Sequence, residues 1–363
     1  MNAQDFTVKR DDLSQTKVVQ KNYPDELMPG QVLLAIDRFS FTSNNITYGV
    51  VGERMSYWSF FPAEQGYGII PAWGYATVIV SSHPDVAVGQ RFYGYYPMSS
   101  HLLVTPGRVS SMGFTDQTKH RKTLPSVYNF YSSTANDPSY SPDTEELTAL
   151  FKPLFVTSFL IDDQLAEEHF YGASQIVLTS ASSKTAQALA CLLANRKKQD
   201  GLKINIIGLT SERNKGFVHQ LGWYDQIVSY EELAELNQKE DFVIVDFTGN
   251  HQLQFQLQTL LEDRLQYNCL VGLVDWHHLK GDQPLPKKGE FFFAPTNAEK
   301  RQKDWGVSGF HQRVGIAWHH FVHSVQSNLV IEQHNGAEEL QILYADMLQG
   351  KVDSKCGNIV SLK

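Results

Sequence analysis

QIVLTSASSKTAQALACLLA, residues 175–194, consists of a short apolar run, a turn of small polar residues and the start of a helical pattern. Helices are also expected over 212–221 and 252–262. Further apolar runs of strand length follow along the chain, namely KINIIGLT (203–210), QIVSY (226–230), DFVIVDFTG (241–249), YNCLVGLV (267–274) and FFFAP (291–295). Strands that alternate with helices form a parallel sheet with helical crossovers. The pattern predicts an α/β fold with about six strands in a doubly wound sheet of the dinucleotide-binding type.

The regions on either side have a different pattern of apolar residues. From Gln31 to about Val109 the apolar runs are short and are broken by Gly, Pro and Ser, which is typical of strands joined by turns. Residues 106–142 lack a helical period and are interpreted as an irregular connection or an inserted lobe. A helix is expected near 337–348 and a strand at 358–362, and the N-terminal region could supply the sheet that this strand needs. We therefore expect a β-rich domain of residues 1–150 plus 326–363, and a dinucleotide-binding domain of residues 151–325.

Composition excludes several classes of protein. The 363 residues are 42% hydrophobic and 19% charged, which is unlike a disordered or fibrous chain. The net charge of −8 gives no bulk attraction to nucleic acid or to anionic lipid. The three cysteines form no CxxC pair, the N-terminus lacks a signal pattern, and no apolar run reaches the roughly 18 residues of a membrane span. The sequence predicts a cytoplasmic protein without nucleic-acid or membrane partners.

The turn after the first parallel strand suggests an anion site. Small residues at 180–183 would let a pyrophosphate approach the free N–H groups at the start of the following helix. The glycines of the GxGxxG fingerprint are absent, so a strand-to-helix turn without chemistry is an equal alternative. Lys184-Thr185 could also end a phosphate-binding loop of an NTPase, but the glycines of that motif are absent as well.

In dinucleotide-binding folds, the residues at the end of the second strand contact the ribose 2′-hydroxyl of the cofactor. Thr210 and Ser211 stand there, followed by Arg213 and Lys215, and such hydroxyl and basic groups suit a 2′-phosphate. The cofactor predicted is NADP(H). The alternative is that Ser211 caps the next helix and that the basic side chains are solvated, and Glu212 is the main argument for it.

Taken together, these segments resemble the medium-chain dehydrogenase/reductase superfamily, in particular its zinc-free quinone oxidoreductase branch. The segments that carry the resemblance are PGQVLLAIDRFSFTSNNIT (29–47), 71–109, TSERNKGFVHQLGWYDQIVSY (210–230), DFVIVDFTG (241–249) and LQGKVDSKCGNIVSL (348–362). The resemblance implies a GroES-like β-barrel domain completed by the C-terminal tail, beside a Rossmann domain. It implies NADPH-dependent reduction of a small conjugated carbonyl compound, such as a quinone or enone, and a possible homodimer. The competing interpretation is a non-catalytic NADP(H)-binding redox sensor or scaffold.

The resemblance also implies site residues. Asn44, Tyr48 and Tyr96 are the candidate catalytic residues, and Tyr93 and Tyr95 lie in the same substrate-side segments. The candidate cofactor-binding residues are Ser180, Ala181, Ser182, Ser183, Lys184, Thr185, Thr210, Ser211, Arg213, Lys215, Tyr230, Thr248, Gly249, Gly272, Leu273 and Val274.

No metal site is expected. Asn44 and Ile70 stand near the places where the zinc-dependent branch has its metal-binding Cys and His, and neither side chain binds zinc well. His319, His320 and His323 form HHxxH on an expected helix over 310–325. That spacing suits zinc, but the glutamate of HExxH is absent, and an exposed helical face is the preferred interpretation.

Overall fold

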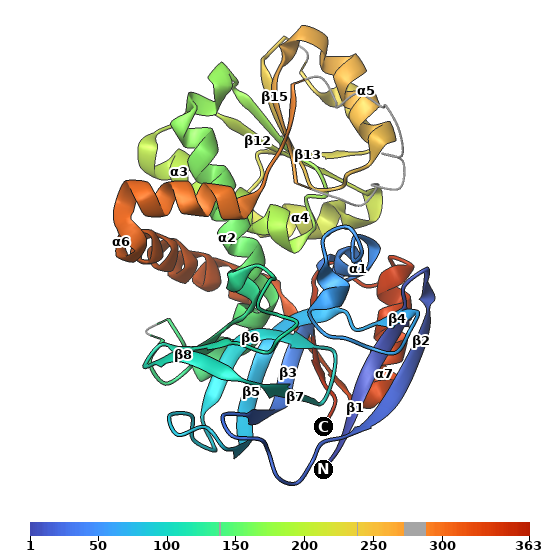
Figure 1. Ribbon diagram of the computed structural model, residues 1–363. Coiled ribbons are helices and arrows are strands. Elements are labelled where there is room, and N and C mark those ends of the chain that lie inside the picture. Colours follow the sequence, from blue (N-terminus) through green and yellow to red (C-terminus); the bar gives the residue numbers. More distant parts are fainter. Residues whose placement is uncertain (138, 238, 272–287) are drawn as a thin grey trace. The chain divides into compact units, whose positions relative to one another are not determined.

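The computed structural model describes residues 1–137, 139–237, 239–271 and 288–363 (Figure 1). The chain forms two compact units, which are described separately. The barrel unit contains residues 1–150 and 330–363, and the Rossmann unit contains residues 151–329. None of the helices in the described ranges combines the length and the apolar character that crossing a membrane requires.

In the described residues of the barrel unit, nine strands form one sheet in the order β17-β18-β3-β5-β6-β10-β9-β8, with β7 also paired to β3. Its strands are β3 (Val32–Phe41), β5 (Pro71–Ser81), β6 (Arg91–Pro97), β7 (His101–Val104), β8 (Pro106–Ser110), β9 (Gly113–Asp116), β10 (Phe130–Ser133), β17 (Val330–Asn335) and β18 (Cys356–Ser361). A second sheet contains β1 (Asn2–Lys9), β2 (Asp12–Asn22) and β4 (Tyr67–Gly68). The helical elements are α1 (Ser43–Val50), α7 (Gly336–Leu348), η1 (Tyr57–Ser59), η2 (Ser126–Tyr128) and η3 (Pro142–Thr144).

The C-terminal strand finds its sheet as expected. β18 pairs antiparallel with β3 and parallel with β17, so the tail completes the barrel unit. Close contact between β3 and β5 depends on Gly74, because a Cβ at that position would lie 2.2 Å from the Arg38 carbonyl oxygen. Large buried side chains such as Phe39, Phe41 and Tyr96 fill the core.

The expectation for residues 106–142 was wrong in part. The segment contains β8, β9 and β10, which extend the main sheet beyond β6. The strands were missed because each has only four or five residues and their pairing is decided by distant partners. A buried arginine, Arg121, ties this segment together by donating to the side chains of Asp116, Asn129 and Tyr131.

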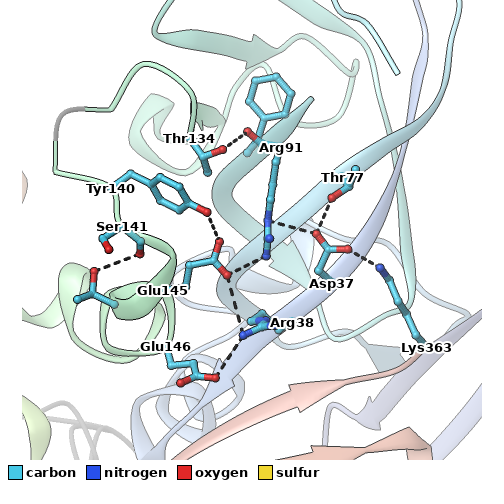
Figure 2. Close-up of polar contacts among 12 residues, drawn as sticks. Asp37, Arg38, Thr77, Arg91, Thr134, Tyr140, Ser141, Glu145, Glu146 and Lys363 are labelled. Atoms are coloured by element: carbon cyan, nitrogen blue, oxygen red, sulfur yellow. Dashed lines mark hydrogen bonds and ion pairs between the residues drawn. The ribbon is translucent and has the colours of Figure 1, made fainter. Parts of the chain in front are cut away.

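A network of charged side chains attaches the start of α2 (Glu145–Glu167) to the barrel strands (Figure 2). The buried Glu145 carboxylate accepts hydrogen bonds from Arg91 Nη2 at 2.9 Å and from the Tyr140 hydroxyl at 2.6 Å. On the same strands, Asp37 pairs with Arg91 and with Lys363 near the C-terminus. The network thus joins β3, β6, α2 and the C-terminal tail.

The Rossmann unit has the predicted doubly wound sheet. In its described residues six parallel strands run in the order β13-β12-β11-β14-β15-β16, which is the 3-2-1-4-5-6 order of dinucleotide-binding folds. Its strands are β11 (Gln175–Leu178), β12 (Asn205–Thr210), β13 (Gln226–Ser229), β14 (Phe242–Asp246), β15 (Leu265–Leu270) and β16 (Gly289–Phe291). Its helical elements are α2, α3 (Lys184–Asp200), α4 (Lys215–Leu221), α5 (His251–Leu261), α6 (Ala294–Val325), η4 (His169–Gly172), η5 (Glu212–Asn214), η6 (Leu233–Glu235), η7 (Glu262–Arg264) and η9 (Gln326–Asn328). The α/β fold class is confirmed.

Candidate functional site

The turn between β11 and α3 is held in one conformation by backbone hydrogen bonds. Ser180 adopts a left-handed backbone conformation with φ of 51°. The Ala181 N–H donates to the Leu209 carbonyl oxygen at 2.9 Å, which ties the turn to β12. Ser183 caps α3 by accepting a hydrogen bond from the Ala186 N–H. The small residues at 180–183 therefore form a rigid turn that leads directly into a helix N-terminus.

Residues on or just after the neighbouring strands β12 and β13 support this turn. The Tyr230 hydroxyl accepts a hydrogen bond from the Ser180 N–H at 3.0 Å, and burial raises the pKa of Tyr230 to about 12. Asn214 Nδ2 donates to Ser182 Oγ at 3.1 Å. Gly208 lies beneath the turn, where an added Cβ would come within 3.0 Å of the Ala181 Cβ. The turn itself contains no glycine, but Gly208 on the neighbouring strand β12 allows the turn to pack closely against the sheet.

The helix start can receive an anion. Within the described ranges, the backbone N–H groups of Ser182 and Thr185 have no acceptor. Donors of this kind at the start of α3, a helix of 17 residues, are the groups that bind phosphate in dinucleotide folds. The residues present fit a pyrophosphate at this position, although the Ser180 N–H is already bonded to Tyr230.

Asp246, at the end of β14, organises the adjacent turn. Its buried carboxylate accepts hydrogen bonds from Thr179 Oγ1 at 2.7 Å, Thr248 Oγ1 at 2.7 Å and the Gly249 N–H at 3.1 Å. Thr248 and Gly249 thus help to hold the carboxyl edge of the sheet, and their binding of the cofactor stays a prediction. Gly272, Leu273 and Val274 lie outside the described residues.

The residues predicted to bind the 2′-phosphate lie at and after the end of β12, and some of them are buried or already have an ion pair. Thr210 is buried and Arg213 is exposed. Lys215 Nζ pairs with Glu232 at 2.7 Å and with Glu212 at 3.4 Å, and the contact with Glu232 raises the pKa of the lysine. A phosphate at this position would have to compete with the two carboxylates.

In the barrel unit, Asn44 and Tyr48 lie together on α1. Burial raises the pKa of Tyr48 well above that of a free phenol, and the side chains of Asn44, Trp73 and Tyr95 lie close enough to oppose the shift. The Tyr95 ring meets the Tyr48 ring edge-on, with 5.8 Å between their centroids. Asn44 is half-buried, whereas the next residue, Asn45, is fully buried and bonded to the backbone.

Tyr96 does not join this group. Its ring packs against Tyr131 and its hydroxyl donates to the Phe92 carbonyl oxygen at 3.0 Å. Adjacent residues of a strand point to opposite faces, so Tyr95 lies on the face that meets Tyr48 and Tyr96 on the other. Of the candidate residues on β6, Tyr95 thus lies with Tyr48 and Tyr96 does not, and the catalytic role of Tyr96 stays a prediction.

The three histidines of HHxxH lie exposed on α6, where His320 contacts Asn195. In the described ranges, no group of three or more His, Cys, Asp or Glu side chains is arranged to hold a metal ion.

Comparison with known proteins places the chain in a family and identifies its fold. Solved structures that include a putative NADPH:quinone reductase and a quinone oxidoreductase share its fold over the full length. Residues 39–353 match the family described as "Protein of unknown function (DUF2855)", and the chain belongs to that family. No curated protein matches the sequence.

Three solved structures illustrate the likeness. CurA from Vibrio vulnificus is 14% identical, with a TM-score of 0.62, and the match covers 100% of this chain and 99% of CurA. A putative NADPH:quinone reductase from Bacillus thuringiensis is 12% identical, with a TM-score of 0.55 and 99% coverage of both chains. The yhdH oxidoreductase from Salmonella enterica, solved in complex with NADP, is 13% identical, with a TM-score of 0.53 and 100% coverage of both chains. These identities are low, so the likeness establishes the fold.

Proposed function

We propose that this chain is an NADPH-dependent oxidoreductase that reduces a small conjugated carbonyl compound without a metal. The observation that supports it most is the rigid turn of small residues between β11 and α3, which leaves donors free at the helix start. CurA has been solved in complex with NADPH and the Salmonella oxidoreductase in complex with NADP. The strand order of the Rossmann unit is the order that binds such dinucleotides.

Each unit carries one part of the proposed activity. The reduced nicotinamide, when bound, supplies the hydride. In the Rossmann unit, the start of α3 binds the pyrophosphate, and Lys215 and Arg213 bind the 2′-phosphate. In the barrel unit, Asn44 and the neutral Tyr48 hydroxyl donate hydrogen bonds to the carbonyl oxygen, where negative charge develops during reduction.

Calorimetry with NADPH and NADH tests the cofactor part of the proposal. NADPH should bind about ten- to a hundredfold more tightly, since a charge-assisted phosphate contact contributes roughly 1.5–3 kcal/mol. Lys215→Ala should remove most of that preference. Lys197→Ala is the matched control, because Lys197 also pairs with a carboxylate, Asp225 at 2.6 Å, but lies near the amino end of β12.

Oxidation of NADPH in the presence of a panel of quinones and enones tests the reaction itself. Turnover of at least one of these compounds, with no turnover of simple alcohols, is the expected result. Tight NADPH binding without any turnover would instead support a redox sensor. Equal affinity for NADH and NADPH would contradict the cofactor assignment.

A further inference from the structure

A group of aromatic side chains in the barrel unit lies around the Tyr48 hydroxyl. We call it the aromatic cluster, and its members are Tyr48 on α1, Tyr57 on η1, Trp73 on β5, Tyr93 and Tyr95 on β6, and Tyr128 on η2. The ring centroids of Trp73 and Tyr95 are 5.0 Å apart, and those of Tyr95 and Tyr128 are 4.7 Å apart. Trp73 and Tyr95 face each other directly in the register of β5 and β6.

Some donors of this cluster are buried near the Tyr48 hydroxyl without the geometry of a hydrogen bond to any described residue. Trp73 Nε1 and the Tyr95 hydroxyl are such donors, and Tyr95 as a whole is 0% exposed. Native proteins rarely leave such groups unpaired, because each costs about 1–3 kcal/mol of lost hydration. The opposite face of β6 differs. There the buried hydroxyls of Tyr96 and of Tyr131, which packs against it, both donate hydrogen bonds to backbone carbonyl oxygens.

We infer that Trp73 and Tyr95 donate hydrogen bonds to one oxygen of a planar, uncharged carbonyl ligand that binds against the aromatic cluster. This inference rests on the proposed function and assigns two further residues to its substrate site. The indole N–H can only donate, so the ligand atom that satisfies it must be an acceptor. Two donors from facing positions of neighbouring strands suit a single oxygen.

The surroundings of the two donors favour a flat and neutral ligand. Aromatic side chains stack against planar conjugated rings. A carboxylate would need a cation to offset its desolvation, and the nearest buried cation, Arg121, is already bonded to Asp116, Asn129 and Tyr131. Burial also raises the pKa values of Tyr48 and Tyr95, so both phenols stay neutral donors.

Two residues on short turns pack against this part of the cluster. The Tyr57 ring centroid lies 4.5 Å from that of Tyr48, and the Tyr128 ring centroid lies 4.7 Å from that of Tyr95. Tyr57 and Tyr128 are half-buried, and their hydroxyl oxygens are 3.5 Å apart. Each lies on a 3-10 turn of three residues, whereas Trp73 and Tyr95 lie on paired strands. A ligand that binds at the donors would therefore displace these two tyrosines, while the sheet keeps the donors in place.

Calorimetry without cofactor tests the inference with two probes of the same carbon skeleton, duroquinone and durene. Duroquinone carries two carbonyl oxygens, and durene carries none. Duroquinone should bind at least tenfold more tightly than durene, and a tetramethylbenzoate anion should bind no better than durene. Tyr95→Phe and Trp73→Phe should each weaken duroquinone binding by about five- to tenfold, the usual effect of one hydrogen bond.

Thermal unfolding separates this role from a structural one. Tyr95→Phe should leave the melting temperature unchanged or raise it, because it removes an unpaired buried hydroxyl. Tyr344→Phe is the control, since its hydroxyl donates to the Leu13 carbonyl oxygen at 2.9 Å in the same unit. That control should lower the melting temperature and leave duroquinone affinity unchanged.

The outcomes distinguish this inference from the proposed function. If the protein binds NADPH but does not prefer duroquinone to durene, or if Tyr95→Phe binds duroquinone as well as the native chain, the inference is overturned and the cofactor assignment stands. If duroquinone binds in the expected pattern while NADPH neither binds nor is oxidised, the ligand site stands and the proposed activity fails.

Discussion

Single buried residues at the carboxyl edge of the Rossmann sheet have several partners each, and Asp246 is the clearest case. The Asp246 carboxylate accepts hydrogen bonds from several N–H and O–H groups. An asparagine has only one acceptor oxygen, so in Asp246→Asn the side-chain NH₂ would face some of these donors. We expect the free energy of unfolding to fall by about 2–4 kcal/mol, since hydrogen bonds to charged groups contribute roughly 1.5–3 kcal/mol each. Urea unfolding of the variant measures this loss.

The control for that experiment is Asp263→Asn, which changes an exposed carboxylate in the same unit. It should alter stability by less than about 0.5 kcal/mol. An equally small effect of Asp246→Asn would show that the turn does not depend on the carboxylate.

At the scale of elements, the extension of the barrel sheet by β8, β9 and β10 depends on the buried pair of Arg121 and Asp116. The guanidinium is 1% exposed and the carboxylate is 0% exposed, with 3.1 Å between Arg121 Nη1 and Asp116 Oδ2. Arg121→Met should destabilise the protein by about 3–5 kcal/mol, because it leaves an unpaired charge in the core. Chemical unfolding followed by near-ultraviolet circular dichroism reports on this segment, which is rich in tyrosine.

A second substitution makes the cause of that loss testable. In Arg121→Met combined with Asp116→Asn, the unpaired charge is gone, so the double variant should recover about 1–3 kcal/mol relative to Arg121→Met alone. Strictly additive losses would mean that the packing of the arginine, and not its charge, holds the extension in place.

The same elements show which parts of the structure the sequence could predict. Strands β11, β12 and β14 were predictable because each is a mostly buried apolar run followed by a helix, and local pattern decides both. β8, β9 and β10 were not, because long-range pairing and a buried ion pair decide them. In the candidate site, the resemblance predicted Tyr48 as a site residue, whereas the pairing of Tyr95 with Trp73 needed the register of β6 against β5.

At the scale of the whole molecule, tyrosine burial dominates the response to pH. The chain has 16 tyrosines, and burial raises the pKa of many of them in both units. Tyr131, Tyr140 and Tyr230 have pKa values raised to about 12, while Tyr93 and Tyr95 are raised well above the ordinary value near 10. These phenols also differ in role, since some hold backbone turns and others belong to the aromatic cluster.

These shifts predict a loss of stability in alkali. Below pH 10 the buried phenols are protonated in both the folded and the unfolded chain, so their contribution to stability is fully present. Above pH 10 the unfolded chain releases these protons first, and the free energy of unfolding therefore falls with rising pH by up to about 1.4 kcal/mol per pH unit for each buried phenol. The melting temperature should be nearly independent of tyrosine ionisation from pH 7 to 9 and should drop steeply between pH 10 and 12.

Absorbance of phenolate at 295 nm, followed in the same samples, should rise together with the loss of circular dichroism, because most tyrosines ionise only on unfolding. Reversible ionisation of most of the 16 phenols near pH 10, in a chain that keeps its circular dichroism, would contradict the burial that supports both the barrel core and the aromatic cluster.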